Sequence, residues 1–289
     1  MPKTREFLDG RVFVVTGAST GIGLEIARGL ALMRARVVLG CRSAERGEAA
    51  RRELVDDSCN DQIEMIEVDL ASQASVRAFA AEVLGRHAQV HGLINNAAVV
   101  PATRQESPDG IELTWATNVL GPFLLTSLMR ERMEASRPAR VVNVASSEAR
   151  GLDLDDVQFV RRSWSPRAAY AQSKQALRMI TWGFDTRFEG RGVTYNAVHP
   201  GLVNTELPRN LGGLAGALAR PVFRWFGRTP AIGADTAVWV ATADENERSS
   251  GNYWVDRKIR KCPFRDEARI DRLWKICTEM TGGPPPSPP

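Results

Sequence analysis

Short runs of apolar residues alternate with longer amphipathic stretches along this chain. The apolar runs predict buried strands at 11–16, 36–41, 63–68, 90–94, 140–145, 193–198 and 252–255. Apolar residues that recur every three or four positions predict helices over 21–34, 44–54, 75–87, 110–133, 170–188 and 229–242. This alternation predicts an α/β fold, with about seven parallel strands in one doubly wound sheet and helices on both of its faces.

No linker interrupts the alternation, so we expect one domain over residues 1–281. Two segments do not fit it: a polar insertion at 148–168 and a stretch rich in glycine, leucine and aromatic residues at 207–228. Both follow the carboxyl ends of predicted strands, where doubly wound sheets bind their ligands. We therefore expect both to border a substrate site, the second as its lid. The proline-rich tail 282–289 is expected to be disordered.

The composition is that of an ordinary globular protein, with 43% hydrophobic residues, 25% charged residues and a net charge of +4. Basic residues do not cluster with aromatic ones, so we expect no nucleic-acid partner. The N-terminus lacks the apolar core of a signal peptide, and no run is long enough to span a membrane. The four cysteines show no disulfide or metal-ligand spacing. We expect a cytoplasmic protein without a transmembrane anchor or a metal ion.

The stretch VTGASTGIG lies between the first predicted strand and the first predicted helix. Gly17 would permit a tight turn there, and Gly21 and Gly23 would let a pyrophosphate approach the backbone. The spacing differs from the usual G-x-G-x-x-G, so an ordinary turn is the alternative for this stretch alone. A phosphate loop here would make the sheet a Rossmann-type, dinucleotide-binding one.

The end of the second predicted strand bears on the choice of dinucleotide. An NAD site places an acidic residue there for the ribose 2′-hydroxyl, whereas this chain has Cys41, Arg42 and Ser43. The Arg42 guanidinium can pair with a 2′-phosphate, so the sequence favours NADP(H) over NAD(H). The alternative is a solvated surface arginine.

Tyr170 and Lys174 lie four positions apart on one face of a predicted helix. An ammonium beside a phenol favours the phenolate, so the pair is a candidate general acid/base, although such pairs also occur by chance. Polar residues gather at other strand ends: Ser146 and Ser147 follow the fifth strand, and Asn118 lies inside an apolar helix. A catalytic site in this fold needs polar groups at several strand ends.

The segments TGASTGIG, NNAA, NVASS, YAQSK and HPGLVNT occur in that order, with Asn118 between the second and the third. Their order and context resemble the short-chain dehydrogenase/reductase family over about residues 10–206. The segments CRS, YxQSK and HPG are similar to its retinol-dehydrogenase-like branch.

The resemblance implies a role for each catalytic candidate. Tyr170 would exchange a proton with the substrate oxygen, and Lys174 would lower the Tyr170 pKa and hold the nicotinamide ribose. Ser146 would orient the substrate oxygen, with Ser147 as the alternative. Asn118 would support a water relay behind Lys174.

The resemblance also implies which residues contact the cofactor and the substrate. Cofactor contacts are expected at Gly17, Ser19, Thr20, Gly21, Ile22, Gly23, Arg42, Asp69, Leu70, Asn95, Ala97, Val119, Tyr170, Lys174, Pro200, Gly201, Val203 and Thr205. Substrate contacts are expected at Ser146, Tyr170, Leu207, Trp225 and Phe226. Ala98 replaces the glycine common in the family's NNAG motif and would narrow the pocket.

These expectations add up to an NADP(H)-dependent oxidoreductase. A hydride would pass between the nicotinamide and a carbonyl or secondary alcohol of a bulky hydrophobic substrate, such as a steroid, terpenoid, polyketide or retinoid-like molecule. The alternatives are a reductase of carbon–carbon double bonds and a catalytically silent NADP(H)-sensing protein. The resemblance also suggests a homo-oligomer, unless the long C-terminal segment covers the faces used.

Overall fold

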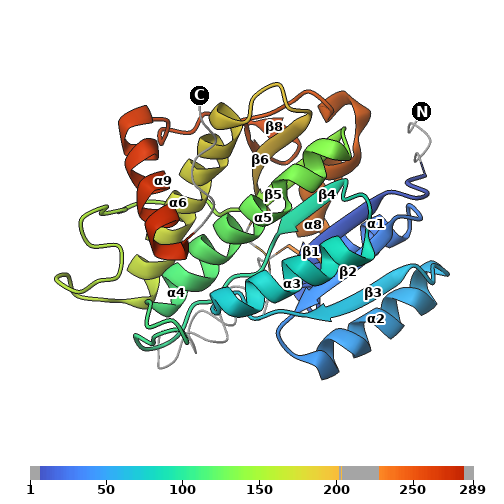
Figure 1. Ribbon diagram of the computed structural model, residues 1–289, viewed down its shortest axis with the longest axis horizontal. Helices are drawn as coiled ribbons and strands as arrows, with labels where there is room; N and C mark the ends of the chain where they lie inside the picture. Colours follow the sequence, from blue (N-terminus) through green and yellow to red (C-terminus); the bar gives the residue numbers. More distant parts are fainter. Residues whose placement is uncertain (1–6, 202, 204–227, 283–289) are drawn as a thin grey trace.

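The computed structural model describes residues 7–201, 203 and 228–282 of the chain. One sheet of eight strands runs through them in the order β3-β2-β1-β4-β5-β6-β7-β8 (Figure 1). The strands are β1 (Val12–Thr16), β2 (Arg36–Cys41), β3 (Ile63–Glu67), β4 (Gly92–Asn95), β5 (Ala139–Val144), β6 (Val193–His199), β7 (Tyr253–Val255) and β8 (Lys258–Ile259). Strands β1 to β7 are parallel, and β8 pairs with β7 antiparallel. The predicted parallel α/β sheet is confirmed, and the short antiparallel strand is an addition to it.

Helices cover both faces of this sheet. The helical segments are α1 (Gly21–Ala31), α2 (Ala44–Ser58), α3 (Gln73–Arg86), α4 (Leu113–Trp115), η1 (Ala116–Leu120), α5 (Gly121–Ala135), α6 (Pro166–Arg187), α8 (Pro230–Thr242), η3 (Asp244–Asn246) and α9 (Glu267–Thr281). Helices α3, α5, α6 and α9 pack into one hydrophobic cluster, and α1, α2 and α8 into another. Figure 1 shows α3, α5 and α6 crossing the near face.

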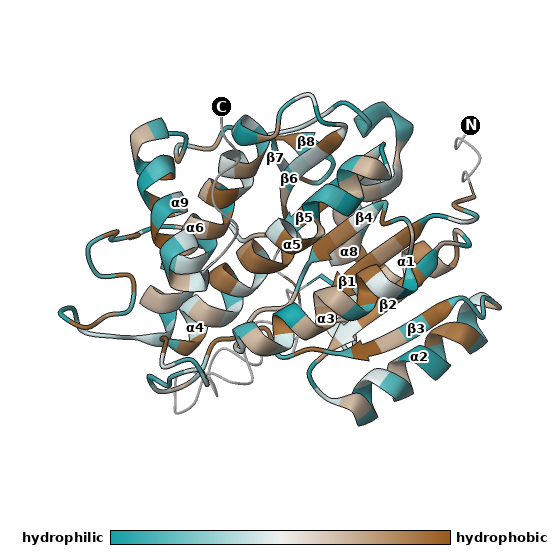
Figure 2. Ribbon diagram, viewed as in Figure 1, coloured by the Kyte–Doolittle hydropathy of each residue, from teal (hydrophilic) through white to brown (hydrophobic). Residues whose placement is uncertain are grey.

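The apolar strands follow from this two-sided burial. All five residues of β1 are buried, because successive side chains of a strand point to opposite faces. Val12 and Val14 join the cluster under α3 and α5, whereas Phe13 and Val15 join the cluster under α1 and α8. The central strands are accordingly brown in Figure 2, and teal residues mark the outer sides of the helices.

Helix α6, which carries Tyr170 and Lys174, begins earlier than predicted. Ser165 caps it by accepting a hydrogen bond from the Ala168 N–H at 3.2 Å, and Pro166 occupies the first turn. The predicted helix over 110–133 is also divided. Its segment η1 is a π-helical turn, which places Asn118 between α4 and α5. Such turns are common at functional sites.

The C-terminal helix α9 was not predicted. Its Trp274 packs edge-on against Phe123 of α5, with ring centroids 4.9 Å apart, and against Phe184 of α6 at 4.7 Å. Helix α9 therefore covers the outer side of α5 and α6. No helix within the described ranges is both long enough and apolar enough to cross a membrane.

Candidate active site

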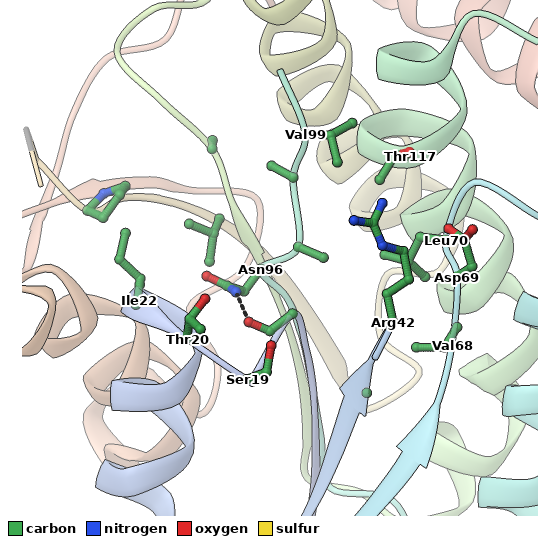
Figure 3. A pocket seen from close by; sticks show the side chains of 18 of the residues that line it. Ser19, Thr20, Ile22, Arg42, Val68, Asp69, Leu70, Asn96, Val99 and Thr117 are labelled. Atoms are coloured by element: carbon green, nitrogen blue, oxygen red, sulfur yellow. Dashed lines mark hydrogen bonds between the residues drawn. The ribbon is translucent and has the colours of Figure 1, made fainter. Parts of the chain in front are cut away.

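A cavity of about 290 Å³ opens at the carboxyl edge of the sheet (Figure 3). Its lining comes from the segments that follow β1 to β6, together with residues of α1, α2, η1 and α6. The lining residues are Gly17, Ser19, Thr20, Gly21, Ile22, Gly40, Arg42, Arg46, Val68, Asp69, Leu70, Asn96, Ala97, Ala98, Val99, Thr117, Val144, Ala145, Tyr170, Lys174 and Pro200. Ligands of doubly wound sheets bind at this edge. The insertion at 148–168 contributes no residue to the lining of this cavity.

The glycine loop is shaped by close approaches of the backbone. Gly17 and Gly21 have positive φ angles of 65° and 60°, which favour glycine. A Cβ on Gly17 would lie 2.8 Å from the Ala97 Cα, and a Cβ on Gly23 would collide with the Gly17 carbonyl and the Asn96 amide. Gly23 thus packs behind the loop and does not line the cavity.

Asn96 holds this loop in place. Its Nδ2 donates to the carbonyl of Thr16 at 3.0 Å. It also donates to the carbonyl of Gly17 at 3.2 Å (Figure 3). Helix α1 starts directly after the loop, and its N-cap residue Thr20 makes no side-chain capping bond. The first turn of α1 contains no acidic residue. Its N–H groups and the helix dipole therefore favour an anion such as a phosphate at this point.

The end of the cavity beside α2 is basic. Arg42 and Arg46 line it, and both side chains are exposed. Neither guanidinium forms an ion pair with any residue in the described ranges. Asp69 lines the same end, but its Oδ1 already accepts a hydrogen bond from the Ala71 N–H at 2.9 Å. Arg46 was not predicted; it lies in the first turn of α2, four residues after Arg42 in the sequence.

Tyr170 lines the other end of the cavity, and the side chain of Ser146 lies beside its phenol. Ser147 is exposed, whereas Ser146 is half-buried. Burial raises the pKa of Tyr170, and the Ser146 side chain opposes this shift without cancelling it. The net direction is thus opposite to the expected lowering by Lys174.

Lys174 is almost fully buried beside Tyr170. Its Nζ donates to the Val144 carbonyl at 2.8 Å and lies 5.6 Å from the centroid of the Tyr170 ring. Burial, followed by the positive charge of Arg178, lowers the pKa of Lys174 to about 7. A lysine in this state can lose or accept a proton near neutral pH.

Asn118 ties the loop after β4 to helix α6. Its Oδ1 accepts from the Val99 N–H at 2.8 Å, and its Nδ2 donates to the Val99 carbonyl and to the Ser173 hydroxyl, both at 3.1 Å. Ser173 donates in turn to the carbonyl of Tyr170 at 2.8 Å. The amide in the π-helical turn therefore supports the helix that carries Tyr170 and Lys174.

The sequence pattern of the short chain dehydrogenase family matches residues 11–213 of this chain. The chain belongs to the short-chain dehydrogenase family. Human retinol dehydrogenase 12 is 40% identical over 284 residues, which are 97% of this chain and 89% of that protein. Human retinol dehydrogenase 13 is 35% identical over 289 residues, with 97% and 87% covered. These relatives place the chain in the retinol-dehydrogenase-like branch of this family of oxidoreductases.

Solved structures share the fold of this chain. An uncharacterised protein from Mycobacterium paratuberculosis superposes with a TM-score of 0.76 at 27% identity, covering 96% of each chain. A short chain dehydrogenase from Burkholderia cenocepacia in complex with NADP gives a TM-score of 0.68 at 26% identity, covering 86% of this chain and 96% of that one.

Several residues that the family resemblance implicated lie away from the cavity. Asn95 is buried in the core, where its Nδ2 donates to Asn143 at 2.8 Å and to Thr126 at 3.1 Å, and its neighbour Asn96 lines the cavity instead. Val119 is also fully buried. Gly201 and Val203 do not line the cavity. The predicted contacts Thr205, Leu207, Trp225 and Phe226, and the predicted lid up to residue 227, lie outside the described residues.

Proposed function

We propose that this chain is an NADP(H)-dependent oxidoreductase that interconverts a carbonyl compound and the corresponding alcohol, with Tyr170 as the general acid/base. One observation carries the proposal. Tyr170, with Ser146 beside it, and the buried Lys174 lie at one end of a cavity whose other end holds Arg42 and Arg46. A dinucleotide extended along the sheet edge would bring its 2′-phosphate to the basic end, its pyrophosphate to the glycine loop and its nicotinamide to the phenol.

The residues of the cavity suit such a cofactor. A side chain at Gly17 would collide with the chain beyond β4, so only glycine leaves the backbone free to meet a pyrophosphate there. The unpaired guanidinium groups of Arg42 and Arg46, in place of an acidic residue after β2, favour a 2′-phosphate over a 2′-hydroxyl. The relative from Burkholderia cenocepacia that was solved with NADP supports this preference.

The nicotinamide cofactor, when bound, supplies the hydride in reduction and accepts it in oxidation. In reduction, Tyr170 donates its phenolic proton to the substrate oxygen as the carbonyl carbon gains the hydride, so one carbonyl, one hydride and one proton give one alcohol. The Ser146 hydroxyl donates a hydrogen bond to the same oxygen and stabilises its developing charge. The protonated form of Lys174, whose pKa is about 7, stabilises the phenolate that remains.

The names of the curated relatives point to the substrate class. Both human relatives are retinol dehydrogenases, and retinol is a large apolar alcohol. We therefore propose a bulky hydrophobic alcohol or carbonyl compound, of retinoid, steroid, terpenoid or polyketide type, and reduction as the direction favoured by NADPH. The reaction would take place in the cytoplasm.

A substrate screen followed by NADPH absorbance tests the proposal. The purified chain is offered retinal, a steroid ketone, an unsaturated ketone and a small polar ketone, each with NADPH and with NADH, and the products are separated by chromatography. We expect an alcohol product from the bulky carbonyls and a clear preference for NADPH. Reduction of the carbon–carbon bond instead would favour the alternative reductase. Tight NADPH binding without turnover of any compound would favour a sensing protein.

A further inference from the structure

Arg178 lies on α6 one helical turn after Lys174, and only 5% of its surface is exposed. Tyr170, Lys174 and Arg178 are spaced by four residues, so they occupy one face of the helix. The proposed acid/base roles of Tyr170 and Lys174 do not explain why Arg178 is buried or why a positive charge stands there.

The guanidinium of Arg178 reaches the end of β5. One of its nitrogens, Nη2, donates to the backbone carbonyl of Ser146 and to the Tyr253 hydroxyl at 2.6 Å. The other, Nη1, lies 3.6 Å from the Cys262 sulfur, and the guanidinium carbon lies 3.7 Å from the centroid of the Tyr253 ring. Arg178 therefore fixes the main chain of the residue whose hydroxyl contacts Tyr170.

The charge of Arg178 is not neutralised locally. No carboxylate in the described ranges lies within ion-pair distance of it, and its hydrogen-bond acceptors are a carbonyl, a phenol and a thiol. By contrast, the nearly buried Arg130 on α5 pairs with Glu134 at 2.7 Å. A buried arginine without an acidic partner is costly, so it usually has a specific role.

The charge acts on the groups around it. Burial is the larger cause that lowers the pKa of Lys174, and the charge of Arg178 is the second. The pKa of His199 is lowered by the same two causes, again with burial as the larger. The titratable groups that act on Tyr170, Lys174 or Arg178 from the surrounding elements are Glu148 after β5, His199 at the end of β6, Tyr253 on β7 and Cys262 after β8. Of the groups facing Lys174, Arg178 contributes the largest charge effect.

We propose that Arg178 is a positioning residue of the active site: its guanidinium holds the Ser146 main chain beside Tyr170 and places a fixed positive charge one turn behind Lys174. The inference rests on the proposed function, because it assigns the geometry and the charge of that reaction's acid/base group. It predicts two separable effects. Loss of the forked hydrogen bonds lowers kcat more than it raises KM, and loss of the charge moves the pH dependence.

The variants Arg178→Met and Arg178→Lys separate these effects. We expect Arg178→Met to lower kcat roughly tenfold and to move the alkaline limb of the kcat/KM profile upward by roughly one pH unit. Arg178→Lys keeps the charge but not the forked hydrogen bonds. Its kcat/KM profile should therefore have the alkaline limb of the wild type, whereas its kcat should stay low. Arg140→Met is the matched control, because Arg140 is 3% exposed and lies at the opposite end of β5. It should leave the pH profile unchanged.

A second readout does not depend on turnover. The chain has five lysines, Lys3, Lys174, Lys258, Lys261 and Lys275, so the pH dependence of acetylation at each can be followed by peptide mass spectrometry. We expect the titration midpoint of Lys174 to rise by roughly one unit in Arg178→Met and to stay constant in Arg178→Lys and Arg140→Met. Equal midpoints in all variants, with a lowered melting temperature alone, would overturn the inference. A wild-type chain that turns over no carbonyl would contradict the proposed function, and the Lys174 midpoints would still decide the effect of Arg178.

Discussion

Replacing Gly23 by alanine tests the glycine loop, because the structure leaves no room for one methyl group there. The added Cβ would collide with the Gly17 carbonyl oxygen and the Asn96 amide, and it would lie 2.9 Å from the Gly17 carbonyl carbon. Two of these three contacts are with backbone. The neighbour that could move, Asn96, is the one that holds the loop through its bonds to Thr16 and Gly17.

The size of the effect follows from these contacts. Inserting one methyl into a packed site costs about 1–3 kcal/mol of unfolding free energy, which corresponds to a loss of roughly 2–5 °C in melting temperature for a chain of this size. The loop must shift to accept the methyl, so its N–H groups no longer meet a phosphate. Loss of one hydrogen bond to a charged group weakens binding by roughly tenfold or more. We expect the NADPH dissociation constant of Gly23→Ala to rise by at least this factor.

Gly85→Ala is the matched control. Gly85 is also a helical glycine, in α3, but a Cβ there meets no atom within 4 Å. Alanine should leave its stability unchanged or raise it by up to about 1 kcal/mol, with wild-type NADPH affinity. Thermal unfolding and the fluorescence of bound NADPH measure both quantities. If Gly23→Ala matched Gly85→Ala in melting temperature and affinity, the packing of the loop described here would be wrong.

Three further predictions concern cofactor choice, packing and pH. Arg42→Asp should raise the KM for NADPH roughly 10- to 100-fold with little effect on NADH, and equal effects on both would contradict the 2′-phosphate assignment. Trp274→Ala should destabilise the fold by about 3 kcal/mol in urea unfolding, because it removes ring contacts to Phe123 and Phe184. A cost below about 1 kcal/mol would show that the packing of α9 adds little to the stability of the fold. Burial and the charge of Arg178 lower the pKa of His199 to about 4, so folding stability should fall as the pH drops from about 6.5 to 4. His199→Gln should reduce this acid-induced loss of folding stability by up to roughly 3 kcal/mol. An unchanged pH dependence of stability in this variant would show that His199 is not its cause.

Most of the sheet could be predicted because its strands are buried on both faces. A run such as Val12–Thr16 is buried throughout and apolar up to Thr16, which is unusual outside such a sheet. The two-residue strand β8 has no such run, since Lys258 and Ile259 are both exposed. Helix α9 did carry a signal. The apolar residues after the Asp266 cap follow the helical spacing, namely Ile270, Leu273, Trp274 and Cys277. This spacing was present in the sequence, but no helix was predicted from it.

The site was predictable where a residue type implies its chemistry. Tyr170, Lys174 and Ser146 carry groups whose reactivity suggests a role, and the structure brings all three together. The choice between Asn95 and Asn96 depends on which face of β4 each side chain takes, and two adjacent asparagines do not reveal this.

Arg178 and the π-helical turn were missed for another reason. Arg178 stands between Leu177 and Met179 in a helix buried on most sides, so the spacing alone does not show that its guanidinium reaches Ser146. The turn at Asn118 depends on hydrogen bonds to Val99, which lies 19 residues away in the chain. Contacts of this range require the folded structure.

The most direct test of the account is the rate of NADPH oxidation by Tyr170→Phe, measured on the bulky carbonyl that the wild type reduces fastest. Tyr195→Phe is the control, since Tyr195 is buried in the core and its hydroxyl has no hydrogen-bond partner among the described residues. We predict that Tyr170→Phe lowers kcat about 100- to 10,000-fold with unchanged NADPH affinity, whereas Tyr195→Phe stays near wild type. Turnover by Tyr170→Phe within a few-fold of the wild type would contradict the assignment of Tyr170 as the acid/base.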